Sequence, residues 1–348
     1  MKKILFITNS SSLSGAEKVA LKISSKLSKY YKFVYVLVGT GNMQKILADS
    51  NIEYITLKKL TLKSFGNVIK KEKPDIIHAH DFRASFLASF FNKKAVVISH
   101  IHQNPKWLHK FSLNSLIFLF SSLKAKNILI VSDSIKDEYI FSKYIDKKMI
   151  NISNPVSCDD IYNKVDRIKK IEEREYDLCY VGRLVPVKRV DMLIDIVFQL
   201  KKHYPKIRCM IVGEGYLFHD LKNKVNDLNL NRNISFCGFQ SNPYQYLNNS
   251  KIFCLTSEWE GFGLVAFEAL SLGLPVVASR VGGLKEIVNS NCGYLCSSIK
   301  EFVESISFLL SDVALLEEKS IASYERAKEL DNIDVYIENI NKIYEQVK

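Results

Sequence analysis

Short apolar runs alternate with longer stretches of helical periodicity along the chain, and this alternation restricts the fold more than any other feature. The runs in the first half are KKILFIT, FVYVLV, PDIIHAH, AVVISH and NILIVS, separated by segments such as GAEKVALKISSKLSKYY. The second half repeats the scheme with YDLCYVG, IRCMIVG, NISFCG, KIFCLTS and LPVVAS. Strands that alternate with helices favour a parallel sheet. The sequence therefore predicts an α/β protein with two doubly wound units.

The length of the chain agrees with two domains, since 348 residues of 47% apolar content exceed one ordinary core. The polar, charged segment NPVSCDDIYNKVDRIKKIEERE separates the two sets of runs, as expected for a linker. We expect a first domain with this linker over residues 1–170 and a second domain over 171–331. A last helix over 332–348 could cross back to pack on the first domain.

The positive charge of the chain is concentrated in the first half. Residues 1–170 contain 29 Lys and Arg against 13 Asp and Glu, a net charge of +16, whereas the remainder contains 20 against 24, a net charge of −4. This asymmetry points to an anionic partner of the first half, such as nucleic acid, an acidic substrate or a lipid surface. A merely lysine-rich surface is the alternative.

Cysteines and apolar stretches indicate the compartment. Most of the seven cysteines lie singly in apolar runs, which indicates buried thiols in a reducing environment, and Cys292 and Cys296 lack the partners of a zinc site. The apolar run in the opening MKKILFITNS is too short for a signal peptide. The longest apolar stretch, 113–123, is far below the ~20 residues that span a bilayer. We expect a cytoplasmic protein.

The most informative segment is SEWEGFGLVAFEALSLGLPVVAS. It predicts a turn EGFG, then a helix from about Leu264 to Leu272. The free N–H groups and positive dipole end of such a helix can bind phosphate oxygens or hydroxyls, and Gly261 and Gly263 let a ligand approach the backbone. The segment is therefore a candidate cradle for an anion or a polyol.

Two carboxylates frame this cradle, Glu260 before the turn and Glu268 inside the helix. Each can accept hydrogen bonds from hydroxyls of a sugar or a ribose. The alternative is a helix-start acid followed by a solvated glutamate.

EGFGLVAFE resembles the E-x7-E signature of retaining glycosyltransferase family 4, and YVGRLVPVKRVDMLIDI resembles the donor-phosphate motif of that family. The similarity extends from the SGAE loop to the EIV that follows LPVVAS. It implies the GT-B fold, in which two Rossmann-like domains face a central cleft, with the acceptor bound by the first domain and the nucleotide sugar by the second. It further implies that Glu260 contacts the transferred sugar and Glu268 the ribose. The cradle would be lined by Gly261, Phe262, Gly263 and Leu264.

Arg183 and Lys188 lie in the loop after YDLCYVG, before a helix that begins near Val190. Two fixed cations there would stabilise a pyrophosphate leaving group more in the transition state than in the ground state. A pair of surface charges is the alternative.

The first domain offers a second candidate turn, in NSSSLSGAEKVALKI. The family usually has two adjacent glycines here, while this chain has Ser14 and Gly15, so only Gly15 is carried over as a donor-binding residue. In the second domain the resemblance places the base and ribose near Gly213 and Gly215, and also near CGFQ.

Histidines follow two strands of the first domain, His78 and His80 after one and His100 and His102 after the next. Ligands bind at the carboxyl ends of strands in open parallel sheets. The resemblance assigns His102 to the transferred sugar, with His100 as its rival. For His78 and His80 we expect packing and hydrogen bonding at a strand end.

No D-x-D triplet occurs in the sequence, so the usual carboxylate pair that holds a metal against a nucleotide diphosphate is missing. We expect no metal and no cofactor; cations and helix dipoles would bind the donor diphosphate instead.

The segment PKWLHKFSLNSLIFLFSSLKAK combines a tryptophan and an apolar helix with lysines at both ends. Such a segment could rest on an anionic leaflet at the inner face of the cell membrane. A helix packed inside the first domain is the alternative.

The resulting hypothesis is a retaining glycosyltransferase that uses a UDP- or GDP-sugar and a glycan or lipid-linked acceptor. Lysine, asparagine and isoleucine richness suggests an AT-rich microbial genome, and bacterial surface polysaccharide, O-antigen, capsule or lipopolysaccharide biosynthesis is the favoured setting. One alternative is a UDP-sugar 2-epimerase of the same fold. The other is a basic nucleic-acid-binding protein, although the chain shows no recognised nucleic-acid motif, and we expect no nucleic-acid partner.

Overall fold

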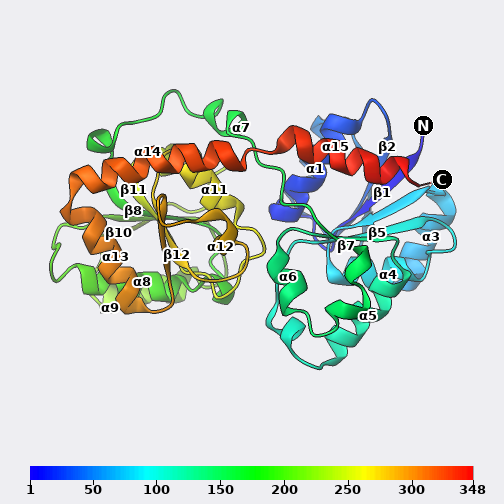
Figure 1. Ribbon diagram of the computed structural model, residues 1–348, viewed down its shortest axis with the longest axis horizontal. Coiled ribbons are helices and arrows are strands. Elements are labelled where there is room, and N and C mark those ends of the chain that lie inside the picture. The colour runs from blue at the N-terminus through cyan, green and yellow to red at the C-terminus, as the bar shows by residue number, and fades with distance from the viewer. Residues whose placement is uncertain (348) are drawn as a thin grey trace. The chain divides into compact units, whose positions relative to one another are not determined.

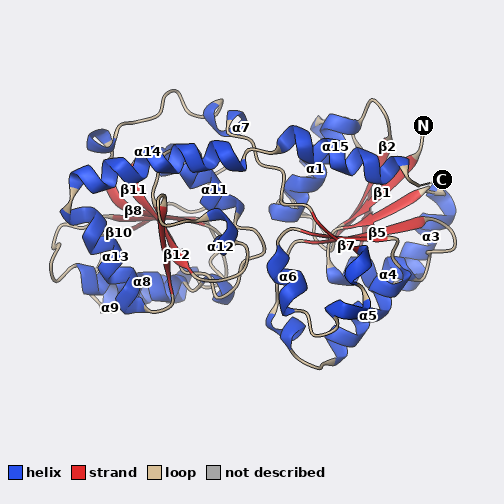
Figure 2. Cartoon of the chain, in the orientation of Figure 1, coloured by secondary structure: helices blue, strands red, loops and turns tan. Residues whose placement is uncertain are grey.

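The computed structural model describes residues 1–347, and the chain forms two compact units, each built on one parallel sheet (Figure 1). The first unit comprises Met1–Pro155 with Asn332–Lys348, and the second comprises Val156–Asp331. Within each unit, helices lie on both sides of the sheet (Figure 2). The predicted α/β class with two parallel sheets is confirmed.

The sheet of the first unit has seven strands in the order β3-β2-β1-β4-β5-β6-β7. Its strands are β1 (Lys3–Ile7), β2 (Lys32–Val38), β3 (Glu53–Leu57), β4 (Ile76–Ala79), β5 (Val96–Ile101), β6 (Asn127–Ile130) and β7 (Met149–Asn151). Its helices are α1 (Gly15–Leu27), α2 (Asn42–Asp49), α3 (Leu62–Glu72), α4 (Phe82–Ser89), α5 (Leu113–Lys124), α6 (Asp133–Glu138) and α15 (Ile333–Glu345), with 3-10 turns η1 (Lys106–His109), η2 (Ser142–Tyr144) and η3 (Asp146–Lys148).

The last helix, α15, completes the core of this first unit. Its residues Tyr336, Ile340, Ile343 and Tyr344 are buried in one cluster with side chains of β1, β2 and α1. Figure 1 shows α15 beside α1, although the two helices lie at opposite ends of the sequence. The apolar face of α15 recurs every three to four residues, which is the spacing that turns one side of a helix toward a core.

The sheet of the second unit has six strands in the order β10-β9-β8-β11-β12-β13. Its strands are β8 (Tyr176–Val181), β9 (Cys209–Val212), β10 (Ile234–Phe236), β11 (Ser250–Leu255), β12 (Val276–Ser279) and β13 (Gly293–Cys296). Its helices are α7 (Asp159–Tyr162), α8 (Val190–Leu200), α9 (Phe218–Asp227), α10 (Tyr244–Asn248), α11 (Leu264–Ser271), α12 (Leu284–Ile287), α13 (Ile299–Ser311) and α14 (Val313–Leu330), with 3-10 turns η4 (Ile171–Glu173) and η5 (Pro186–Lys188).

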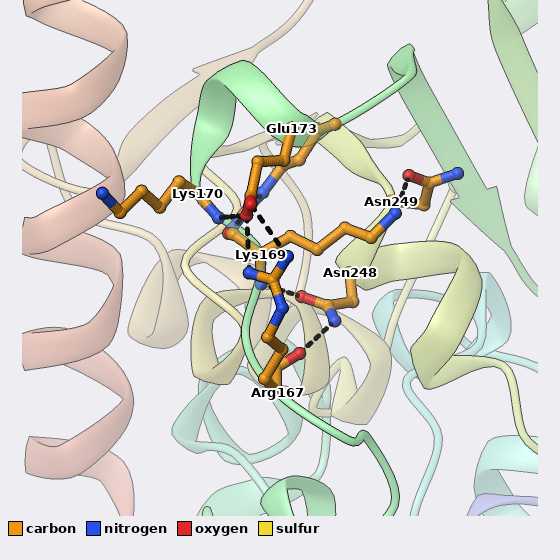
Figure 3. A network of polar contacts seen from close by, with 7 residues as sticks. Arg167, Lys169, Lys170, Glu173, Asn248 and Asn249 are labelled. Carbon is orange, nitrogen blue, oxygen red and sulfur yellow. Dashed lines mark hydrogen bonds and ion pairs between the residues drawn. The ribbon is translucent and has the colours of Figure 1, made fainter.

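The boundary predicted at residue 170 is wrong, because the second unit already begins at Val156. The polar stretch 156–170 is held by partners far away in the sequence. The amide N–H of Cys158 donates to the Asp331 carboxylate at 2.8 Å, and the amide N–H of Lys169 donates to the Asn248 side chain at 2.9 Å. Figure 3 shows the latter bond with its neighbours, including the return bond from Asn248 to the Arg167 carbonyl at 2.7 Å. A composition typical of a linker thus belongs to an ordered edge of the second unit.

The cysteines are free thiols, and all but the half-buried Cys237 are buried, which confirms the prediction of buried thiols. Over residues 1–347, no helix combines the length and the apolar character that crossing a bilayer requires.

Candidate functional site

The candidate donor site lies in the second unit, at the edge where the parallel strands end. β8 and β11 are neighbours in the sheet, so the loops that follow them leave it side by side. The two loops are also bonded directly, since the Glu258 N–H donates to the Val187 carbonyl at 2.8 Å. The Thr256 hydroxyl donates to the Lys188 carbonyl at 3.1 Å. The structure therefore brings the two predicted motifs together.

Lys188 and Glu260, one from each loop, form an ion pair with 2.5 Å between Nζ and Oε2. Their side chains are only 16% and 17% exposed, so the pair is largely shielded from solvent. The Ser257 hydroxyl donates to the same carboxylate oxygen at 3.1 Å. Burial, and then the negative charge of Glu260, raise the pKa of the nearby Tyr180 phenol. An incoming diphosphate would have to compete with Glu260 for Lys188.

Arg183 lies exposed in the same loop as Lys188. Its carbonyl accepts a hydrogen bond from the Tyr180 hydroxyl at 3.1 Å, which fixes the backbone of the loop. Its guanidinium forms no salt bridge with any residue in the described part of the chain. Arg183 therefore keeps its positive charge available to an anion.

The helix α11 begins directly after Gly263, whose φ of 94° lies in the left-handed region that favours glycine. A Cβ at this position would also lie 2.6 Å from a methyl carbon of Leu284. No side chain within residues 1–347 caps this end of the helix. The first turn, which starts at Leu264, thus presents N–H groups and the positive end of the helix dipole to a ligand.

Two other residues of the predicted cradle are buried and can contribute only their backbone. Phe262 is 3% exposed, so its ring belongs to the core rather than to a ligand surface. The Gly261 carbonyl already accepts a hydrogen bond from the Gly283 N–H at 3.1 Å.

Glu268, in the second turn of α11, is 8% exposed, which contradicts the alternative of a solvated glutamate. The Tyr244 hydroxyl donates to its Oε1 at 3.2 Å. Burial, and then the charge of Glu268, raise the pKa of Tyr244, so this phenol stays protonated and remains a donor. Tyr244 is a partner of the candidate site that the sequence pattern did not reveal, because no local spacing links it to Glu268.

Gly213 and Gly215, predicted to lie near the base and ribose, have a structural reason to be glycine. A Cβ at Gly213 would lie 1.9 Å from the Gly182 carbonyl oxygen, and one at Gly215 would lie 2.2 Å from that of Leu184. The loops after β8 and β9 thus touch backbone to backbone. Phe239 of the CGFQ segment is 58% exposed beside this contact and donates its N–H to Glu214 at 3.2 Å.

The turn before α1, predicted to face a phosphate, has an acidic partner of its own. The Ser14 N–H donates to the Glu17 carboxylate at 3.1 Å, and the Ser14 hydroxyl bonds the same oxygen. Burial raises the pKa of Glu17. The start of α1 is therefore a weaker anion site than the uncapped start of α11, and the role of Gly15 stays a prediction.

The four histidines of the first unit form one cluster at the ends of β4 and β5. His78 Nε2 lies 3.2 Å from His100 Nδ1, and His80 Nδ1 lies 3.1 Å from His102 Nε2. The Tyr344 hydroxyl of α15 lies 2.6 Å from His78 Nδ1. The expected packing and hydrogen bonding of His78 and His80 at a strand end is confirmed.

Burial keeps the imidazoles of this cluster neutral. It lowers the pKa of His78 to about 3 and that of His102 to about 4, and it holds the pKa values of His80 and His100 well below the ordinary range. His102 is partly exposed while the other three are at most 1% exposed. Its Nδ1 is nevertheless buried without a hydrogen-bond partner among residues 1–347, and its Nε2 faces His80. The assignment of His102 to the transferred sugar stays a prediction.

Ring nitrogens of His78, His80 and His100 lie within 4.8 Å of one another, a spacing that metal ligands can have. Two of these rings already satisfy each other by the His78–His100 hydrogen bond. The cluster belongs to the first unit, and the donor motifs belong to the second. The absence of metal from donor binding stays a prediction.

Two family models match the chain. Glycosyl transferases group 1 matches residues 162–346, slightly more than half of the chain, and Glycosyltransferase Family 4 matches residues 48–160. The chain belongs to the glycosyl transferases of group 1. The match confirms the family and the enzyme class that the sequence motifs of this glycosyltransferase indicated.

Curated relatives of this glycosyltransferase are similar over nearly their whole length. A UDP-Gal:alpha-D-GlcNAc-diphosphoundecaprenol alpha-1,3-galactosyltransferase of Escherichia coli is 26% identical, covering 94% of this chain and 95% of that protein. An N-acetylgalactosamine-N,N'-diacetylbacillosaminyl-diphospho-undecaprenol 4-alpha-N-acetylgalactosaminyltransferase of Campylobacter jejuni is 27% identical, with coverages of 96% and 97%.

Among solved structures, Anabaena HepE in complex with UDP and glucose superposes with a TM-score of 0.86 at 20% identity, over 99% of this chain and all of that one. Sucrose-phosphate synthase from Thermosynechococcus elongatus has a TM-score of 0.80 at 16% identity, over all of this chain and 99% of that one. At such identities the likeness concerns the fold, and it confirms the predicted GT-B architecture.

Proposed function

We propose that this glycosyltransferase moves a sugar from a UDP- or GDP-sugar to a glycan or lipid-linked acceptor and retains the anomeric configuration of the donor. The observation that carries the proposal is the Lys188–Glu260 pair on two bonded loops beside the uncapped start of α11. Fixed cations and free N–H groups suit a diphosphate, and neighbouring carboxylates suit sugar hydroxyls.

The relatives support this choice of substrates. The Escherichia coli relative is named for a UDP-Gal donor and a diphosphoundecaprenol-linked acceptor, and the Campylobacter jejuni relative also acts on a diphospho-undecaprenol carrier. A further relative, CapH of Staphylococcus aureus, is a capsular polysaccharide biosynthesis glycosyltransferase. Bacterial surface polysaccharide or lipopolysaccharide assembly is thus the proposed setting.

In the proposed reaction, the bond between the anomeric carbon and the diphosphate oxygen breaks while the acceptor oxygen bonds to the same face of that carbon. The departing diphosphate takes the proton of the acceptor hydroxyl and leaves as the nucleoside diphosphate. Arg183 and Lys188 oppose the negative charge that grows on the leaving oxygen. A double displacement would need a carboxylate nucleophile under the anomeric carbon. Glu260 is assigned to the sugar hydroxyls and Glu268 to the ribose, so neither takes that position.

A donor screen followed by product analysis tests the proposal. We expect one UDP- or GDP-sugar to raise the melting temperature, and the transfer product to keep the donor's configuration in its NMR anomeric coupling. The variant Lys188→Gln should bind that donor at least tenfold more weakly, since a charge-assisted contact is lost. Lys224→Gln is the matched control, because Lys224 pairs with Asp195 at 2.7 Å on the same unit. An inverted product would contradict the mechanism.

The same assays separate the alternatives. A 2-epimerase would release a changed UDP-sugar without any acceptor, whereas the proposed enzyme needs the acceptor for turnover. A gel shift at physiological salt tests the basic first half of the chain for nucleic-acid binding, which we do not expect. Activity should survive EDTA, because the proposed donor contacts involve no metal.

We also propose that the first unit docks on the anionic inner face of the cell membrane, through an apolar face of α5. This helix buries Ser115, Phe118, Ser121 and Ser122, while Leu113, Leu116, Phe120 and Leu123 are 73%, 39%, 40% and 53% exposed. An ordinary surface helix buries its apolar side chains and exposes its polar ones, whereas α5 buries three serines and exposes four large apolar side chains.

Lysines precede and follow this apolar helix in the sequence, and their positive charge would attract anionic lipid headgroups. Lys124 lies 4.0 Å from the ring centre of Phe120, and the same segment also carries Lys106, Lys110 and Lys126. Leu113→Gln combined with Leu123→Gln should reduce flotation with phosphatidylglycerol liposomes, while Leu62→Gln, at an exposed leucine on α3, should not. Equal flotation on neutral liposomes would contradict the proposal.

A further inference from the structure

We propose that Thr256 is a positioning residue, whose hydroxyl holds the backbone of Lys188 and Arg189 so that the Lys188 ammonium group can reach a bound diphosphate. The inference rests on the proposed function, in which Lys188 binds the diphosphate of the donor. Thr256 directly follows β11, whereas Lys188 ends the turn η5 in the loop after β8. The two residues are therefore neighbours in space and not in sequence.

The Thr256 hydroxyl is a buried donor to two successive carbonyl groups. The residue is 0% exposed, and its Oγ1 lies 2.8 Å from the carbonyl oxygen of Arg189 and 3.1 Å from that of Lys188. A hydroxyl has a single proton, so the two carbonyls share it in a three-centre hydrogen bond. A methyl group in its place would fill the same space and would leave both carbonyls without this donor.

The segment that Thr256 holds has an unfavourable backbone conformation. Arg189 has a φ of 47° and a ψ of 43°, which lie in the left-handed region that residues with a Cβ rarely adopt. Such a conformation persists only where neighbouring contacts enforce it. Without the hydroxyl, Arg189 can relax toward a more favourable φ, and this rotation would turn the preceding residue, Lys188, away from its position.

Backbone hydrogen bonds fix the other side of Lys188, so that its side chain is the part left to move. The Lys188 N–H donates to the Val185 carbonyl at 3.0 Å, and the Val187 carbonyl accepts from the Glu258 N–H at 2.8 Å. The ammonium group can then leave Glu260 for a diphosphate while the backbone stays in place. A cation on an ordered loop binds its ligand without the cost of ordering that loop first.

A double-mutant cycle in calorimetry tests the inference, with the nucleoside diphosphate of the donor found in the screen as the ligand. We expect Thr256→Val to weaken binding about threefold to tenfold, and Thr256→Ser, which keeps the hydroxyl, to bind within about twofold of the wild type. In a Lys188→Gln background, Thr256→Val should change the affinity less than about twofold, because Thr256 acts through Lys188. Ser250→Ala is the matched control and should bind like the wild type, since this buried hydroxyl donates to the Tyr246 carbonyl at 2.9 Å from the opposite end of β11.

Hydrogen exchange of the Glu258 amide, followed by NMR, tests the loop without any ligand. We expect faster exchange in Thr256→Val, because the bond to Val187 weakens when the loop is released, and wild-type exchange in Thr256→Ser. If Thr256→Val does not fold, Thr256→Ala replaces it, since alanine also lacks the hydroxyl and cannot overpack the site.

Three results would overturn the inference while the proposed function stands. They are wild-type affinity in a folded variant without the hydroxyl, an equal loss of affinity with and without Lys188, and unchanged exchange of the Glu258 amide. Wild-type affinity in Lys188→Gln itself would instead refute the donor contact of the proposed function, and the inference with it.

Discussion

Acid should unfold the first unit at a pH that most proteins tolerate, because its core contains neutral histidines. The pKa of His78 is about 3 when folded, against an ordinary value of 6.5. Between pH 3 and pH 6.5, His78 therefore binds a proton in the unfolded chain but not in the folded chain. The stability that depends on neutral His78 is fully present above pH 6.5 and is lost as the pH falls toward 3.

The expected size follows from linkage, since each pH unit below 6.5 costs about 1.4 kcal/mol for one such group. At pH 5 the loss from His78 alone is about 2 kcal/mol. The pKa values of His80 and His100 are lowered in the same direction, so their effects add to it. Because a domain has a free energy of unfolding of about 5–15 kcal/mol, the loss is a large part of the total.

Urea unfolding at pH 7 and pH 5, followed by tryptophan fluorescence, measures this loss. The two tryptophans lie in different units, so Trp259→Phe leaves Trp107 as the reporter of the first unit. Trp107 packs against Phe82 with 4.7 Å between ring centroids and should respond to unfolding. His78→Gln should be less stable than its parent at pH 7 but should lose about 2 kcal/mol less between pH 7 and pH 5. His203→Gln, on the exposed surface of the second unit, is the control. The reasoning is refuted if the pH dependence is the same with and without His78.

Three further outcomes are expected. Gly282→Ala should destabilise the second unit by more than ~3 kcal/mol, because a Cβ would lie 1.8 Å from the Glu260 carbonyl oxygen at a φ of 48°. Gly238 also has a positive φ, but a Cβ there would meet nothing closer than 3.7 Å, so Gly238→Ala should lower the free energy of unfolding by about 1–2 kcal/mol. Equal losses for the two variants in urea titrations would contradict the account. Tyr244→Phe should weaken nucleotide binding about threefold to tenfold in calorimetry, since it removes the hydroxyl that orients Glu268; unchanged affinity would exclude that role. Arg183→Gln should lower kcat more than it raises KM for the donor, and the reverse pattern would mean that Arg183 serves ground-state binding.

The fold was largely predictable because its signals are local. Apolar runs such as KKILFIT and KIFCLTS are the central strands β1 and β11, and the glycine-framed helix 264–272 is α11 within one residue. Three strands, β3, β7 and β13, escaped prediction. β3 is largely exposed, β7 has three residues and β13 is half-buried, so none of them has the long apolar run of a central strand.

The rest depends on contacts between residues that are distant in sequence. The domain boundary was misplaced because a polar stretch looks like a linker until its partners, such as Asp331 for Cys158, are known. The pairing of Lys188 with Glu260 joins two motifs that the sequence analysis assigned to different parts of the donor. Tyr344 approaches His78 only because α15 returns to the first unit. Spacing along the chain contains no trace of these pairs.

A crystal structure with bound UDP, or GDP if the screen selects it, tests the central claim most directly. Both phosphates should lie at the first turn of α11, accept hydrogen bonds from backbone N–H groups near Leu264, and take Lys188 away from Glu260. Phosphates bound elsewhere, with the Lys188–Glu260 pair intact and the start of α11 facing only solvent, would contradict the account.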